Sequence, residues 1–98
     1  MRPLLHVDVS TAARALLFAP QQDRDSLCAR MIAGAEQADL HVKRTGRLHP
    51  EHGNGSLMAA ARFWPLADEP SFDNVQYCEC FEMVMRHLIR HHASPTRS

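Results

Sequence analysis

The most unusual chemistry in this sequence is concentrated in residues 46–56, GRLHPEHGNGS, which contain three of the chain's four glycines, one proline and two histidines. A GNGS segment that opens a helix leaves backbone N–H groups free at the positive end of the helix dipole. Three cationic side chains precede it by a few residues, and a reversal of the chain would bring them to the same place. The resulting hypothesis is a phosphate or carboxylate site made of Lys43, Arg44, Arg47, Asn54, Gly55 and Ser56.

The alternative for the same loop is that it only turns the chain. Gly46, Gly53 and Gly55 would then supply positive φ angles, at least two of the three, and Asn54 or Ser56 would cap the next helix. The spacing is not that of a P-loop, because it has no Gly-Lys-Ser/Thr sequence and no preceding strand. These structural roles account for every glycine, so the turn is the preferred interpretation.

Seven histidines and three cysteines raise the question of a metal site. The pairs in HPEH (residues 49–52) and CEC (residues 78–80) have unsuitable spacing, since two cysteines two residues apart on a helix point about 200° away from each other. In HLIRH (residues 87–91) the two histidines are four apart and can reach one ion, but no third ligand is evident. We therefore expect no metal and no cofactor.

A nucleophilic cysteine is the next chemistry to consider, since Cys78 and Cys80 occur in a histidine-rich chain. No third group that would orient a Cys–His pair can be identified, and free cysteine usually behaves as a small hydrophobic residue. The carboxylates Asp39, Glu51 and Glu82 show no paired pattern. We expect no catalytic residue and no enzymatic activity.

Aromatic and apolar side chains are also concentrated at the end of one predicted helix and in the loop that follows it. Exposed apolar patches on small proteins usually mark a partner surface, and aromatic residues are frequent anchors of interfaces. The alternative is that these side chains close one end of the core. The predicted partner-binding residues are Phe63, Trp64, Leu66 and Phe72.

Composition restricts the class of protein. Ninety-eight residues, 45% of them hydrophobic and 22% charged, correspond to one ordinary globular domain. Eleven basic and eleven acidic residues leave no global field that would attract nucleic acid or acidic lipid. No run approaches the roughly 18 apolar residues of a membrane helix, and three cysteines suggest no disulfide framework. We expect a cytoplasmic protein with a helical domain over residues 1–93 and a disordered tail over residues 94–98.

Apolar periodicity predicts an all-α bundle of about four helices, with the glycine-rich loop between the second and the third. No run of alternating β-branched residues predicts a strand. Stripes at three- and four-residue spacing place the helices at residues 8–20, 20–46, 56–64 and 71–92.

Several residues are expected to begin or end these helices, or to allow their close packing. Asp8 is the predicted N-cap of the first helix, and Leu4 and Leu5 form a buried lead-in before it. Gly46 is expected after the end of the second helix, and Gly34 within it suggests that another helix crosses closely there. A capping box is expected at the start of the fourth helix, with Asp73 and Gln76 as its members.

Three segments, MRPLLHVDVSTAARALL, RTGRLHPEHGNGSLMAAA and DEPSFDNVQYCECF, together resemble a group of small uncharacterised proteins from alphaproteobacteria. The resemblance covers nearly the whole chain. It implies a bacterial, cytoplasmic, single-domain protein, and no catalytic residue can be carried over from it.

These observations favour a small accessory or regulatory protein that binds another protein or forms a homo-oligomer. A module that binds an anion or nucleic acid through the Lys43–Ser56 region is the alternative. Nucleic acid is the less favoured ligand because the third helix offers only Arg62 as a cation. An enzyme or a metal-binding protein ranks last.

Overall fold

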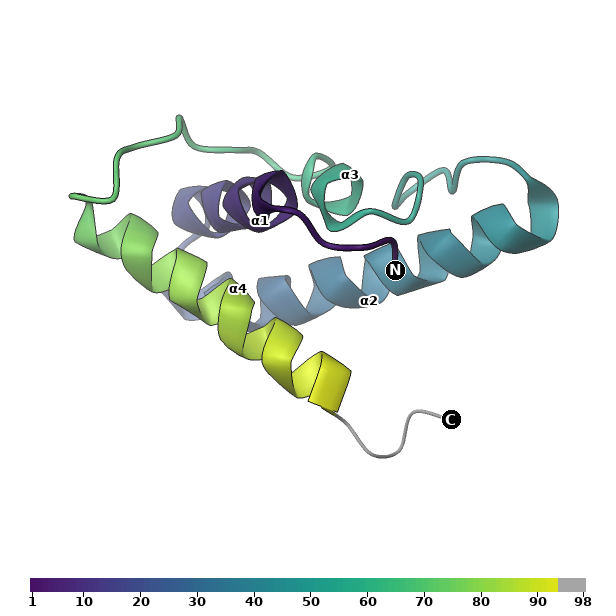
Figure 1. The fold of residues 1–98 in the computed structure, drawn as a ribbon. Helices are drawn as coiled ribbons and strands as arrows, with labels where there is room; N and C mark the ends of the chain where they lie inside the picture. The colour runs from purple at the N-terminus through teal and green to yellow at the C-terminus, as the bar shows by residue number, and fades with distance from the viewer. Residues whose placement is uncertain (94–98) are drawn as a thin grey trace.

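Helix α1 (His6–Phe18) lies in the middle of the fold and contacts every other α-helix. The computed structural model describes residues 1–93, and Figure 1 shows its elements. A 3₁₀ turn (η1, Gln21–Asp23) leads into α2 (Arg24–Thr45), which is followed by α3 (Leu57–Ala61) and α4 (Val75–Ala93). The predicted all-α bundle of four helices is therefore confirmed. The tail predicted at residues 94–98 lies outside the described residues.

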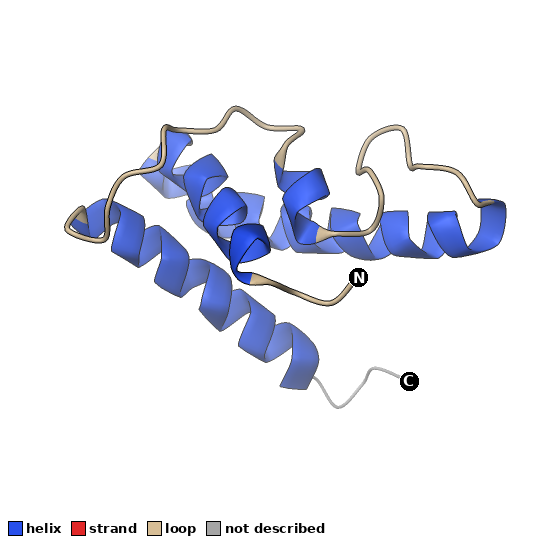
Figure 2. Cartoon of the chain, turned by 45° about the horizontal axis from the view of Figure 1, so that its top comes forward, coloured by secondary structure: helices blue, strands red, loops and turns tan. Residues whose placement is uncertain are grey.

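The two long helices α2 and α4 diverge toward their C-terminal ends, with α1 and α3 packed across them (Figures 1 and 2). The second half of α2 extends beyond α4, and the loop of residues 46–56 folds back along it. None of the helices described is long and apolar enough to cross a membrane.

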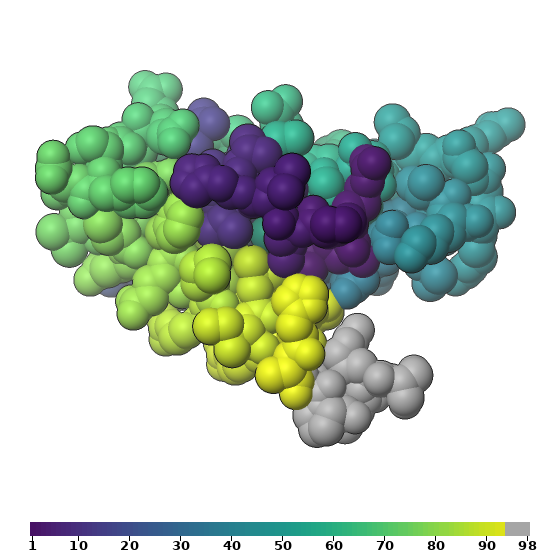
Figure 3. All heavy atoms as spheres, in the orientation of Figure 1, coloured from purple at the N-terminus to yellow at the C-terminus, as the bar shows by residue number. Residues whose placement is uncertain are grey.

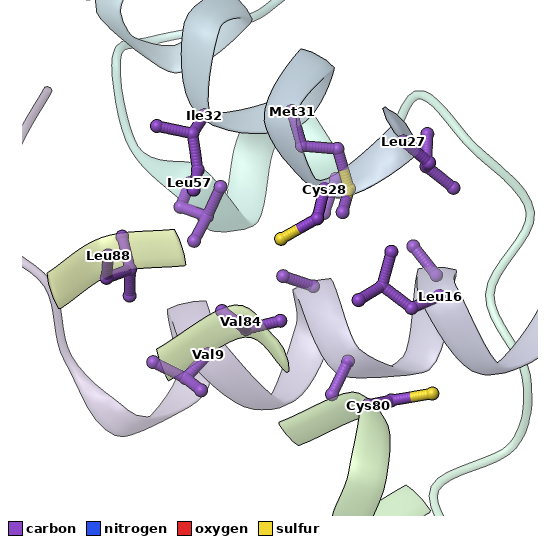
Figure 4. Close-up of a cluster of buried hydrophobic side chains, with 14 of the residues drawn as sticks. Val9, Leu16, Leu27, Cys28, Met31, Ile32, Leu57, Cys80, Val84 and Leu88 are labelled. Atoms are coloured by element: carbon purple, nitrogen blue, oxygen red, sulfur yellow. The ribbon is translucent and has the colours of Figure 1, made fainter. Parts of the chain in front are cut away.

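The core lies where α1, α2, α3 and α4 meet, and Figure 4 shows side chains from all four pointing toward one another. Burying a large aliphatic side chain contributes roughly 1.5–3 kcal/mol relative to leaving it in water. The predicted stripes supply most of this core. Its largest fully buried side chains are Tyr77, Leu16, Met31, Leu57, Val84, Cys28 and Cys80.

The start of α1 differs from the prediction. The helix begins at His6 with Leu5 as its N-cap, so Asp8 is the third helical residue and not the cap. From there the Asp8 carboxylate accepts the Leu5 N–H at 2.9 Å, which satisfies one of the free donors at the helix start. The predicted buried lead-in is also wrong for Leu5, which is 66% exposed.

The connection from α1 to α2 depends on a buried cation that the sequence patterns did not reveal. Arg24 is only 8% exposed. Its guanidinium donates to the carbonyl oxygens of Leu16 at 2.8 Å and Leu17 at 3.2 Å, and also to the Gln76 side chain at 3.4 Å. Free carbonyls at a helix C-terminus favour a cation, so Arg24 joins the end of α1 to α2 and α4.

The predicted capping box of α4 is replaced by a single side chain. Asn74 Oδ1 accepts the Tyr77 N–H at 2.9 Å, while Gln76 is committed to Arg24. Asp73, the other expected member of the box, instead interacts with Ser71. Asparagine caps a helix as well as aspartate does, and the two residues are adjacent in the sequence, so pattern alone could not separate them.

The glycine-rich loop packs against α2. All three of its glycines have positive φ, as expected, and Gly46 ends α2 in the left-handed region with its N–H bonded to the Val42 carbonyl at 2.8 Å. Gly34 does not mark a helix crossing, because a Cβ atom there would lie 2.6 Å from Nδ1 of His52. A histidine of the loop occupies the space that this glycine leaves.

Candidate functional site

An open apolar groove runs between the start of α1 and the C-terminal part of α4, and we call it the α1–α4 groove. Its volume is about 660 Å³. In Figure 3 the purple atoms of the first residues lie beside the green and yellow atoms of α4. The side nearer α1 is formed by Leu4, Leu5, His6 and Val9, and the α4 side by Phe81, Met85, Leu88, Ile89, His92 and Ala93.

The groove is open because α4 carries a wider apolar surface than the core covers. Tyr77, Val84 and Leu88 face the core and are at most 5% exposed. Met85 and Ile89 are four residues apart on a neighbouring strip of the same helix, and they remain 42% and 62% exposed. A surface helix typically buries an apolar stripe of about 100° or more. The additional strip on α4 is therefore available for contact with another molecule.

The residues that line the groove favour contact with an apolar group. No Asp, Glu, Lys or Arg among residues 1–93 lines it, and its polar members are His6 and His92. The His6 ring packs 5.8 Å from the ring of Phe81, between centroids, which connects the two sides. Because no ionised carboxylate or guanidinium faces the groove, an apolar side chain could enter it without desolvating one.

The predicted anion site is occupied by groups of the chain itself at the start of α3. The Met58 N–H donates to the Asp8 carboxylate at 2.9 Å, and the Ala59 N–H donates to Ser56 Oγ at 3.1 Å. Ser56 is thus the N-cap, one of the two caps expected, while Asn54 Oδ1 accepts the Ser56 N–H at 2.9 Å. The N–H groups of Ser56, Met58 and Ala59 are therefore already bonded to acceptors of the chain.

The cations of the anion hypothesis do not converge on the start of α3. Lys43 forms an ion pair with Asp39 at 3.0 Å, and Arg44 and Arg47 are exposed at the far end of α2. Asp39 lies directly beneath Gly55, because a Cβ atom added to Gly55 would be 2.8 Å from the Cα atom of Asp39. The hydrogen bond from Lys43, and then that from the Met1 amino group, lowers the pKa of this carboxyl group. A carboxylate held in its charged form beside the loop opposes anion binding there.

The predicted partner-binding residues do not form one patch. Phe63 is 54% exposed near the glycine-rich loop, whereas Leu66 packs against the core. Trp64 also packs against the core, and the Arg30 guanidinium lies 5.5 Å from the centre of its ring. Phe72 is 55% exposed, and its ring meets the ring of Phe81 edge-on with the centroids 5.3 Å apart. Phe72 therefore continues the apolar surface beyond the groove.

The histidines and cysteines considered as metal ligands lie in separate places. His49 and His52 stack on each other in the loop against α2, with ring centroids 4.8 Å apart, while Cys80 is buried in the core. Among residues 1–93 no group of three or more His, Cys, Asp or Glu side chains is arranged to hold a metal ion.

Two of the three histidines of α4 are paired with carboxylates of α2. His87 Nε2 lies 2.9 Å from an oxygen of Asp25, and His91 contacts Glu36. The hydrogen bond from His87 and its charge lower the pKa of Asp25. Burial alone would raise the pKa of Glu36, but hydrogen bonds from the Met1 amino group and His91 outweigh it, so this pKa is also lowered. These pairs tie α4 to α2.

Burial makes two of the three cysteines, Cys28 and the nucleophile candidate Cys80, poorly suited to act as nucleophiles. Burial raises the pKa of the Cys28 thiol to about 12 and also raises the pKa of Cys80. Cys78, which is half-buried, donates its S–H to the Phe72 carbonyl. A thiol with a raised pKa supplies little thiolate, the nucleophilic form, near neutral pH.

Residues 2–88 match the model of a protein family described as a domain of unknown function, DUF7742. The chain belongs to this family. No curated protein and no solved structure matches the sequence. The DUF7742 match covers α1, α2, α3 and α4 as far as Leu88, so Ile89, His92 and Ala93 of the groove lie beyond it, and it assigns no activity.

The residues that form the groove of this DUF7742 chain were mostly missed by sequence reasoning. Neither Met85 nor Ile89 is among the predicted partner-binding residues. A signal was present, because Phe81, Met85 and Ile89 repeat every four residues beside the stripe that contains Val84 and Leu88. The position of Leu5 across from them depends on how α1 packs, which no local pattern encodes.

Proposed function

We propose that this chain acts by binding, as a small accessory or regulatory protein that docks another protein chain in the α1–α4 groove. The observation that carries the proposal is the exposure of two large aliphatic side chains on opposite sides of the groove. Leu5 is 66% exposed and Ile89 is 62% exposed. Covering apolar surface of this kind gains roughly 25 cal/mol per Å² removed from water.

The occupant expected in the groove is an apolar strip of protein, because no acidic side chain and no Lys or Arg lines the groove. An amphipathic helix supplies such a strip, with apolar residues every three or four positions. Burial raises the pKa of the Cys28 and Cys80 thiols, so these two groups supply little thiolate for nucleophilic catalysis. The resemblance to alphaproteobacterial proteins supports the bacterial cytoplasm as the place of action.

Site-specific photo-crosslinking tests this function. A photoreactive amino acid replaces Ile89 in one variant and Val75 in a control variant, in cells that produce the chain. Val75 is 70% exposed on the same helix but does not line the groove. We expect a protein adduct from position 89 and none from position 75. Equal adduct patterns, or no adduct from position 89, would contradict the proposal.

A further inference from the structure

We propose that a second recess, at the C-terminal end of α1, binds a proline-rich segment of another protein in the polyproline II conformation. We call it the Trp64 recess. It has a volume of about 300 Å³ and is lined by the end of α1, the start of α2 and the segment that follows α3. Its principal lining residues are Phe18, Pro20, Leu27, Arg30, Trp64 and Pro65.

The Trp64 recess is separate from the α1–α4 groove. The groove uses residues at the start of α1, whereas the recess uses Phe18, the last residue of that helix. The 13 residues of α1 place these two ends about 20 Å apart. Within residues 1–93 no residue lines both sites. The proposal therefore does not depend on docking in the groove.

Two aromatic side chains and two prolines give the recess flat apolar surfaces. Phe18 is 59% exposed although its side chain is large and apolar, and Trp64 is only partly buried. Pro20 and Pro65 are both exposed residues of the same recess. Aromatic-lined grooves of this kind recognise polyproline II segments, which are already ordered before they bind. A proline side chain also loses almost no rotational freedom on burial, so the entropic cost of binding is low.

Two residues of the recess carry hydrogen-bond donors that have no acceptor within residues 1–93. The Arg30 guanidinium lies 5.5 Å from the centre of the Trp64 ring, a cation–π contact that leaves its N–H groups free to donate. The Trp64 indole N–H likewise forms no hydrogen bond in this part of the chain.

A proline-rich segment supplies the acceptors that these donors lack. Polyproline II has no internal hydrogen bonds, so its carbonyl oxygens are all open to a donor, and proline itself has no N–H group. The carbonyls inside an amphipathic helix are already bonded within that helix. The donors of Arg30 and Trp64 therefore favour polyproline II over a helix as the occupant of this recess.

The charges at the recess fit a neutral ligand. Among residues 1–93 the charged residues that line it are Asp23 and Arg30, so the lining has no net charge. The Asp23 carboxylate opposes binding of a phosphate or another small anion at the Arg30 guanidinium. A run of prolines carries no charge and meets neither penalty.

Trp64 is the chain's single tryptophan, so its signals report directly on this site. Capped decaproline is titrated into the purified full chain while Trp64 fluorescence and the indole N–H resonance are followed. We expect one saturable change with a dissociation constant below about 1 mM. A capped Gly-Ser peptide of the same length exposes carbonyls without proline rings and should give no such change. No saturable change with decaproline, or an equal change with the Gly-Ser peptide, overturns the proposal.

Variants at exposed positions locate the binding site. Phe18→Ala removes one aromatic ring of the recess and should weaken decaproline binding by about tenfold. Phe63→Ala is the matched control, because Phe63 is 54% exposed and adjacent to Trp64 in the sequence but does not line the recess. Arg30→Gln should weaken binding severalfold, whereas Arg62→Gln should leave it unchanged. Equal effects of a recess variant and its control would overturn the recess as the site.

Discussion

Asp8 and Met58 are 50 residues apart, yet the Asp8 carboxylate accepts the Met58 N–H at 2.9 Å while its other oxygen accepts the Leu5 N–H at the same distance. One buried side chain, 4% exposed, thus satisfies donors at the starts of two helices, α1 and α3. Its negative charge lies at the positive ends of both helix dipoles. This relationship fixes the direction of α1, and with it the position of Leu5 at the groove.

Asp8→Asn should destabilise the fold because the amide lacks the charge and turns an N–H₂ group toward one of the two donors. A hydrogen bond to a charged group contributes about 1.5–3 kcal/mol, so we expect a loss of that size in the free energy of unfolding. Urea denaturation measures it. Asp68→Asn, at an exposed residue, is the control and should change little. Equal stability of the two variants would show that Asp8 does not connect the helices energetically.

Arg24→Lys should destabilise the chain although it conserves the charge. The guanidinium reaches the Leu16 and Leu17 carbonyls and the Gln76 side chain at once, and a single ammonium group cannot reproduce that planar set of donors. We expect a loss of about 1.5–3 kcal/mol, read from chemical denaturation. Arg62→Lys, at an exposed position after α3, is the matched control. A loss no larger than that of the control would remove the assigned role of Arg24.

Gly55→Ala should cost more stability than Gly46→Ala. Both residues have positive φ, 99° and 71°, so alanine at either position is strained by about 1–2 kcal/mol. A Cβ atom at Gly46 meets nothing within 4 Å, whereas one at Gly55 lies 2.8 Å from the α2 backbone at Asp39. The difference between the two thermal melting temperatures reports the packing of the loop on α2. If the two variants melt together, the loop does not pack there in solution.

Acid should weaken the contact between α2 and α4. The pKa of Asp25 is lowered by His87, and the pKa of Glu36 is lowered by its hydrogen bonds despite burial. When the pKa of a carboxyl group is lower in the folded chain than in the unfolded chain, its charged form stabilises the fold. This stabilisation is complete above the ordinary pKa values, 3.8 for Asp25 and 4.5 for Glu36, and it is lost as the pH falls through the lower pKa values of the folded chain. Asp25→Asn should therefore lower the melting temperature near neutral pH and have no effect once the carboxyl group is protonated. A pH-independent effect would contradict this assignment.

Local patterns were sufficient to predict the four helices, the end of α2 at Gly46 and the cap of α3 at Ser56, whereas the caps predicted at Asp8 and Asp73 were wrong. Periodic apolar residues gave the stripes that meet in the core, and Gly46 ends α2 because only a residue without Cβ adopts positive φ there without strain. Helix boundaries shifted by a few residues where two capping residues were adjacent, as at Asp73 and Asn74. Local sequence is sufficient for these features because they depend on contacts within one or two turns.

The remaining features depend on packing between distant segments. The use of Asp8 by α3, the burial of Arg24 and the contact of His52 with Gly34 each join residues that no short-range pattern connects. The groove is of the same kind, because Leu5 and Ile89 become neighbours of one hollow only when α1 lies across α4. The anion hypothesis was reasonable for free N–H groups, and the sequence alone could not show that Asp8 would reach them.

Docking in the α1–α4 groove is the central claim, and oxidative footprinting of the methionines tests it most directly. Met85 lines the groove and is 42% exposed, while Met58, half-buried on α3, lies outside it and serves as the internal reference. The chain is labelled with hydroxyl radicals once in dilute purified form and once in a concentrated extract of the cells that produce it. We expect oxidation of Met85, relative to Met58, to fall severalfold in the extract because a bound protein covers the groove. An unchanged Met85 to Met58 ratio would contradict the claim.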